Sequence, residues 1–107
     1  MKRIFIWLDD ERPMLGFQSP YLQNEIMFHA RNYQECIDAI IEAQSQDYEI
    51  WIHFDNDLGE EKEGYDVAKY IVENQIPIKY RIHTMNPVAR KNIEQLLSHY
   101  GYKQFQW

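Results

Sequence analysis

Two apolar segments that each end abruptly in acidic residues constrain the fold of this chain most. Residues 3–8 and residues 49–54 are largely apolar, and acidic runs that begin at Asp9 and at Asp55 follow them directly. A short apolar run without polar alternation is typical of a strand that is buried on both faces of a parallel sheet. The two segments therefore predict two buried strands with acids at their carboxyl ends.

Further strands and helices alternate along the rest of the chain. Apolar residues between turn residues predict strands at residues 26–30, 80–83 and 103–107. Apolar residues at helical spacing predict helices from Asn32 to Gln46, from Gly64 toward Pro77 and from Asn86 to Gly101. Residues 12–24 show no helical period, so we expect the first helix to be short or missing.

Strands that alternate with helices favour a mostly parallel sheet that helices cover on both faces. The 107 residues suffice for one domain. We therefore expect a single α/β domain over residues 1–107, a three-layer sandwich. If the two acidic strands are neighbours, the strand order is the flavodoxin-like order two-one-three-four.

The composition excludes several classes of protein. The 17 acidic and 11 basic residues give a net charge of −6, which opposes binding to long nucleic acids or anionic membranes. The one cysteine, Cys36, permits no internal disulfide, and one thiol with four scattered histidines does not form a zinc finger. No apolar run approaches the ~18 residues of a membrane span, and no signal segment is present, so we expect a cytoplasmic protein.

Acidic residues are expected to meet at one edge of the sheet. The carboxyl ends of parallel strands share an edge, where ligands bind in such folds. At least three carboxylates would converge there, and the candidate ligands are Asp9, Asp10, Asp55 and Asp57. Like charges repel by a few kcal/mol at about 4 Å, and a hard cation, Mg²⁺ or Mn²⁺, would neutralise them. The alternative is that these acids are solvated turn residues or helix caps.

Residues near the same edge suggest phosphate binding and proton transfer. Asn86 and Pro87 open a helix whose free N–H groups and dipole favour an anion. Arg90 follows in its first turns and could bind a phosphate through two hydrogen bonds, or be a plain surface charge. His53 and His83 are candidates for general acid, general base or metal ligand, although a strand histidine is more often a hydrogen-bonded core residue.

The remaining aromatic residues are interpreted as structural. Trp7 and Trp51 fall inside predicted strands, so we expect them in the core rather than on a surface that stacks nucleobases. His29 and His99 have no acidic neighbours of this kind, and we assign them structural roles.

The acidic motifs resemble those of the receiver domains of two-component signalling. They are the segment from Leu8 to Pro13, Asp55 with Asp57 two residues on, and Thr84 after the fourth strand. The resemblance implies a receiver-like fold, with Asp55 as the phospho-acceptor. It also implies that Asp57 contacts the metal through its carbonyl group and that Thr84 is the switch hydroxyl. Asp9 and Asp10 would be the acidic pair.

A narrower family shares more of the pattern. Residues 7–13, 53–59, 64–68 and 83–90 resemble the receiver-derived domains described as cyclic-phosphate processing. These domains are encoded by bacteria and phages and are proposed to act on cyclic phosphates of nucleotide or ADP-ribose type. Ordinary receivers have a Lys-Pro pair after the fifth strand. This chain lacks the pair, and Lys103 is a poor substitute.

The leading hypothesis is a metal-dependent phosphoesterase, a cyclic phosphodiesterase or phosphohydrolase that opens a small cyclic phosphate. Asp10 and Asp55 would hold Mg²⁺, and His53 or His83 would move protons; alternatively, Asp55 attacks phosphorus itself. Two other functions remain open: a stand-alone receiver, and a non-catalytic module that binds a cyclic nucleotide or a protein. The sequence sets no oligomeric state. The expected substrate contacts are Thr84, Asn86 and Arg90.

Overall fold

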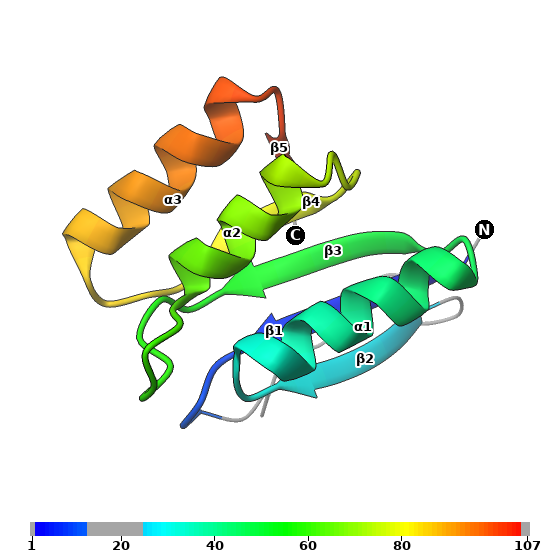
Figure 1. The fold of residues 1–107 in the computed structure, drawn as a ribbon, viewed down its shortest axis with the longest axis horizontal. Helices are drawn as coiled ribbons and strands as arrows, with labels where there is room; N and C mark the ends of the chain where they lie inside the picture. Colours follow the sequence, from blue (N-terminus) through cyan, green and yellow to red (C-terminus); the bar gives the residue numbers. More distant parts are fainter. Residues whose placement is uncertain (1, 13–24, 106–107) are drawn as a thin grey trace.

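Parallel strands and helices alternate along the chain from residue 25 onward, as Figure 1 shows. The computed structural model describes residues 2–12 and 25–105. Its elements in order are β1 (Arg3–Leu8), β2 (Glu25–Ala30), α1 (Tyr33–Ser45), β3 (Glu49–Phe54), α2 (Gly64–Glu73), β4 (Lys79–Ile82), α3 (Pro87–His99) and β5 (Lys103–Gln104). The expected short or missing first helix falls on residues 13–24, outside the described residues.

All five described strands form one sheet in the order β2-β1-β3-β4-β5, and every pair is parallel. The two acidic strands, β1 and β3, are therefore neighbours, which is the condition for the predicted convergence of their acids. Leu8 pairs with Phe54, and Phe54 pairs with Ile82. The last residues of three strands thus share one row, and the residues that follow them emerge together at the carboxyl edge.

One face of the sheet holds the main core. Side chains alternate between the two faces along a strand, so the even-numbered residues of β1 and β3 point to the same face. Buried residues of these strands on this face are Ile4, Ile6, Leu8, Ile50, Ile52 and Phe54. They form one cluster with buried helix residues that include Cys36, Ile40, Val67, Ile71, Ile93 and Leu97. All three described helices therefore pack on this face.

The opposite face carries a smaller aromatic cluster. Phe5, Trp51 and Phe105 are buried there, and the rings of Trp51 and Phe105 stack at 4.6 Å between centroids. The predicted receiver-like α/β fold is confirmed. Within the described residues it has two of the three predicted layers, because the sheet has its described helices on one face only.

Side-chain caps define where two of the helices begin. The Asn32 side chain accepts a hydrogen bond from the Glu35 N–H group at 2.8 Å and starts α1 where the sequence predicts. Asn86 caps α3, whose first residue is Pro87, again as predicted. His83, predicted as the last residue of a strand, lies one residue beyond β4.

Candidate active site

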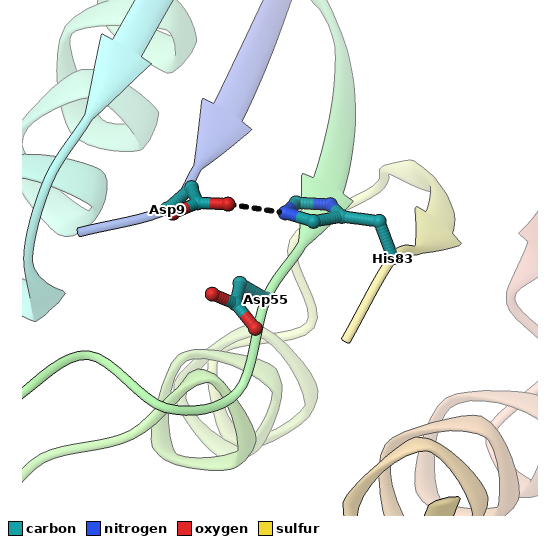
Figure 2. Close-up of side chains that lie close together, drawn as sticks. All are labelled: Asp9, Asp55 and His83. Carbon is teal, nitrogen blue, oxygen red and sulfur yellow. Dashed lines mark hydrogen bonds and ion pairs between the residues drawn. The ribbon is translucent and has the colours of Figure 1, made fainter. Parts of the chain in front are cut away.

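The backbone brings Asp9, Asp55 and His83 to one place. The sheet hydrogen bonds continue one residue beyond the strands: Asp9 N to Ala30 O at 3.0 Å, Asp55 N to Leu8 O at 2.9 Å, and His83 N to Phe54 O at 2.8 Å. One carboxylate oxygen of each aspartate and one ring nitrogen of the histidine lie within 4.8 Å of one another. Figure 2 shows Asp9 joined to His83, with Asp55 beside them.

Asp9 is the most completely bonded residue of this group. Its side chain is 1% exposed, and Oδ1 accepts from the N–H groups of Glu11 at 2.9 Å and Arg12 at 2.7 Å. Oδ2 accepts from Arg12 Nε at 3.2 Å and lies 3.0 Å from His83 Nε2. Burial alone would raise the pKa of Asp9, but these donors together hold it below its ordinary value. Asp9 is therefore ionised at neutral pH.

The two histidines continue this hydrogen-bonded chain. His83 Nδ1 lies 2.7 Å from His53 Nδ1. An ionised Asp9 can only accept, so His83 Nε2 carries the proton between them, and a neutral His83 then accepts at Nδ1 from the Nδ1–H of His53. Burial lowers the pKa of His83 to about 4 against the opposing effect of Asp9. Burial, with the neighbouring His83, lowers the pKa of His53 to about 3, so both rings are neutral at neutral pH.

Trp7 packs against the hydrogen-bonded series formed by Asp9, His83 and His53. Its ring stacks on His83 with 4.1 Å between centroids and 6° between planes. Its Nε1 donates to the carbonyl oxygen of Arg12 at 2.9 Å. Trp51 is a buried core residue as predicted, whereas half-buried Trp7 belongs to the site, a role that the sequence analysis missed. His29 also supports the site, because its Nε2 lies 2.7 Å from the carbonyl oxygen of Asp9.

Asp55 differs from Asp9 in its partners. It is 8% exposed, and its Oδ1 accepts from the Asn56 N–H group at 2.8 Å. Burial and, less strongly, the charge of Asp9 raise the pKa of Asp55, while the Asn56 N–H group, Arg12 and the Thr84 hydroxyl oppose the rise. Asp55 is therefore the more basic of the two buried carboxylates.

An open pocket of about 460 Å³ lies at this edge of the sheet. The described residues that line it are Asp9, Asp10, Glu11, Arg12, Asp55, Asp57, Gly59 and Met85. All four predicted acidic ligands are thus brought to one pocket. Asp10 is half-buried and Asp57 is exposed. Gly59 has φ +67°, and a Cβ atom on it would lie 2.9 Å from Asp10 Oδ2, so glycine allows the loop to approach Asp10 closely.

The donor set of the pocket fits a hard cation, although not at its tightest cluster. Asp9, Asp55 and His83 are close enough to share an ion. However, four donors already use the lone pairs of Asp9, and His83 Nε2 is engaged with it. Asp10, Asp55 and Asp57 are the other predicted ligands that line the pocket, and oxygen donors of this kind suit Mg²⁺. Of the predicted metal ligands, Asp9 is therefore the poorest fit.

The start of α3 differs from the expectation for an anion site. The Asn86 side chain accepts from the N–H groups of Val88 and Ala89, both at 3.1 Å, and Pro87 has no N–H group. The N–H groups that the sequence analysis expected to be free therefore donate within the chain. The expectation fails because the same asparagine that begins the helix also satisfies its first donors.

Thr84 and Arg90 lie at different depths. Thr84 is buried, its Oγ1 accepts from Asn86 N at 3.2 Å, and its hydroxyl also contacts the Asp55 carboxylate. Arg90 is exposed, and its Nη2 lies 3.5 Å from the Thr84 carbonyl oxygen. It is not among the described residues that line the acidic pocket. The roles of Thr84, Asn86 and Arg90 in substrate binding remain predictions.

Lys103 lies away from the acidic residues. It begins β5 opposite Lys79 and lines another pocket, together with Tyr100 and Tyr102. The amino end of a parallel strand lies at the opposite edge of the sheet from its carboxyl end. Lys103 is therefore unsuited to act at the acidic pocket, in agreement with the expectation that it is a poor substitute for the lysine of the Lys-Pro pair.

Comparison with known proteins gives one match. A family model described as cyclic-phosphate processing receiver domain matches residues 4–99. No curated protein and no solved structure gives a significant match to the chain. Among the described residues, no helix combines the length and apolar character needed to cross a membrane.

Proposed function

Because the chain belongs to the family of cyclic-phosphate processing receiver domains, we propose that it hydrolyses one ester bond of a small cyclic phosphodiester, of nucleotide or ADP-ribose type. The observation that supports this most is the hydrogen-bonded chain from Asp9 through His83 to His53, beside the basic carboxylate of Asp55. Acceptance of a phosphoryl group needs one carboxylate. Hydrolysis of an ester also needs a proton for the leaving oxygen, and the paired histidines offer a route for it.

The proposed reaction adds water across one P–O ester bond. Asp55 accepts a proton from the attacking water, and its buried position at the end of β3 holds its carboxylate at the pocket. The P–O bond to the leaving oxygen breaks as the bond from water to phosphorus forms. The leaving oxygen takes up one proton, which the paired rings of His53 and His83 relay from solvent, and Asp55 afterwards releases the proton of the attacking water to solvent. Asp9 holds the His83 ring in position through Nε2.

The charge of the pocket favours a divalent cation as cofactor. Among the described residues, five acidic residues and one basic residue line it, and a phosphodiester anion would be repelled by this excess of carboxylates. We propose that Asp10, Asp55 and Asp57 hold Mg²⁺, or Mn²⁺ in its place. When bound, the ion would polarise the phosphoryl group. Asp9 would instead orient His83 and Arg12.

The proposal is tested with a panel of cyclic phosphates in the presence of Mg²⁺. The panel contains 2′,3′-cyclic and 3′,5′-cyclic nucleotides and a cyclic phosphate of ADP-ribose, and ³¹P NMR follows release of the monoester. Asp55→Asn and His83→Ala should each lower turnover at least ~100-fold, the range of a lost general base or acid. Asp38→Asn is the matched control, because Asp38 is exposed on α1. Full activity in both site variants would contradict the assignment.

Metal binding is tested separately from turnover. Titration of the wild type and Asp10→Asn with Mg²⁺ should give an affinity at least ~10-fold weaker for the variant, because a charged oxygen ligand becomes neutral. Equal affinities would mean that Asp10 is only a turn residue. The same titration of Asp9→Asn addresses whether Asp9 is an orienting residue rather than a ligand.

A stand-alone receiver is the second candidate function. The burial of Asp55 at the end of β3, with the Thr84 hydroxyl beside it, favours this reading. Incubation with acetyl phosphate and Mg²⁺ distinguishes the two functions. A stable aspartyl-phosphate on Asp55, without turnover of any cyclic phosphate, would favour the receiver. Binding of a cyclic phosphate with neither reaction would instead indicate a non-catalytic binding module.

A further inference from the structure

The acidic pocket has a strongly unequal charge distribution. Arg12 is the one basic residue among the described residues that line it. A bound phosphate would need positive charge on the protein side as well as any cation in the pocket, because its oxygens gain negative charge as an ester bond breaks. Arg12 is therefore the described residue of the pocket that is best suited to contact the phosphate directly.

Arg12 is anchored at one end and open at the other. Its backbone N–H and its Nε both donate to the Asp9 carboxylate, at 2.7 and 3.2 Å, and its carbonyl oxygen accepts from Trp7 Nε1. The side chain is nevertheless 51% exposed. No hydrogen bond joins its two Nη groups to any other of the described residues. A guanidinium held through Nε keeps its Nη donors available in a fixed direction.

The other arginine considered for this role is less suitable. Arg90 directs an Nη group to the Thr84 carbonyl oxygen at 3.5 Å and does not line the pocket. Arg12 also lines the same pocket as Asp55. Arg31, which is exposed and is not among the described residues that line the pocket, provides the matched control.

We propose that Arg12 is a catalytic residue that binds the phosphate group directly. Its Nη groups donate to the non-bridging phosphate oxygens, while its Nε remains on Asp9. This assignment rests on the proposed function for the identity of the substrate, but the ligand chemistry that it requires is any phosphate anion in this pocket. Arginine suits the role because two parallel N–H donors match two phosphate oxygens.

The test measures binding of inorganic phosphate at saturating Mg²⁺, without turnover. Isothermal titration compares the wild type with Arg12→Gln, Arg12→Lys and Arg31→Gln. We expect phosphate affinity to fall at least tenfold in Arg12→Gln, to fall less in Arg12→Lys, and to stay within twofold of the wild type in Arg31→Gln. The ¹⁵N signals of the His83 ring report in parallel whether the bond from His83 to Asp9 survives each change.

The outcomes separate this assignment from the proposed function. No phosphate binding by the wild type, or wild-type affinity in Arg12→Gln, would overturn the assignment. If the His83 signals change in Arg12→Gln, the phosphate affinity of Arg12→Lys is compared with that of Arg12→Gln. An affinity at least threefold higher in Arg12→Lys supports direct binding by Arg12, and a smaller difference overturns it. Failure to hydrolyse any cyclic phosphate would contradict the proposed function alone, since phosphate binding is measured independently.

Discussion

His53 and His83 face each other through their Nδ1 atoms at 2.7 Å, although 30 positions separate them in the chain. One of these nitrogens must donate and the other must accept. Because His83 uses its Nε2 proton toward Asp9, its Nδ1 accepts and His53 donates. The hydrogen bonds therefore run in one direction, from His53 to His83 and from His83 to the buried Asp9 carboxylate. This arrangement requires both rings to be neutral.

The first prediction concerns pH and stability. Both rings have a pKa below the ordinary 6.5, about 4 for His83 and about 3 for His53. Between pH 6.5 and 4 the unfolded chain takes up protons that the folded chain does not, so the stability present above pH 6.5 is lost as the pH falls. Each histidine should contribute up to about 1.4 kcal/mol per pH unit to the slope.

Urea unfolding at several pH values in this window measures the slope. The double variant His53→Gln, His83→Gln should have a shallower slope than the wild type. His99→Gln is the control, because His99 is exposed on α3. Asp55 has a raised pKa and acts in the opposite direction, but it is present in all variants and does not affect their comparison. An unchanged slope in the double variant would mean that the histidines are not buried as neutral rings.

The second prediction compares two adjacent acids. Asp9→Asn should destabilise the protein by about 2 to 4 kcal/mol, because an amide cannot accept from all four donors that converge on the buried carboxylate. Asp10→Asn should change stability by about 0.5 kcal/mol or less, as is usual for exposed or half-exposed positions. Urea unfolding in metal-free buffer at pH 7 measures both. Equal destabilisation would contradict the distinct roles assigned to them.

The third prediction concerns Trp7 as a positioning residue. Trp7→Phe retains a ring against His83 but loses the Nε1 bond to Arg12, whereas Trp7→Leu loses both contacts. We expect costs of about 1 and about 3 kcal/mol in the free energy of unfolding. The readout beyond stability is the ¹⁵N spectrum of His83, which should shift toward a mixture of tautomers in Trp7→Leu only. An unchanged His83 spectrum in Trp7→Leu would leave Trp7 a packing residue.

The fourth prediction uses two glycines. A Cβ atom on Gly64 would overlap the backbone carbonyl oxygen of Asp55 and lie 3.0 Å from the Cα atom of Asn56. Gly64→Ala should therefore destabilise the protein by about 3 kcal/mol or more and weaken phosphate binding, because the Asp55 backbone must move. Gly101 has φ +85° with open space around it, so Gly101→Ala should cost only about 1 kcal/mol and leave phosphate binding unchanged.

Thermal unfolding and phosphate titration of the two glycine variants provide the measurements. The same chemical change is made in both, so their difference reports the close approach of α2 to the end of β3. Similar stability and similar phosphate affinity in the two variants would argue against that approach.

Most of the fold could be predicted because its signals are local. Continuous apolar runs identify buried strands, Asn32 and Asn86 identify helix starts, and the alternation of strands with helices indicates a parallel sheet. The position of the acidic residues follows from the same logic. Residues one step beyond Leu8 and Phe54 must emerge at one edge once these strands pair.

The roles of individual residues in the site were harder to predict because they depend on where each side chain points. Asp9 and Asp10 are adjacent acids, yet one is buried among four donors and the other lines the pocket. Trp7 and Arg12 were missed as site residues, although both lie within the motif that carries the family resemblance. A signal was available in the alternation of strand residues, which places Trp7 and His53 on the same face.

The sequence by itself determined the α/β fold and the strand ends at which acids and histidines gather, because apolar periodicity and strand ends are properties of short segments. Only the tertiary structure decided which aspartate has its oxygens occupied by internal hydrogen bonds, which histidine contacts that aspartate, and which arginine lines the pocket. These choices depend on contacts between residues as distant as Asp9 and His83, and no local pattern specifies the distances across a sheet.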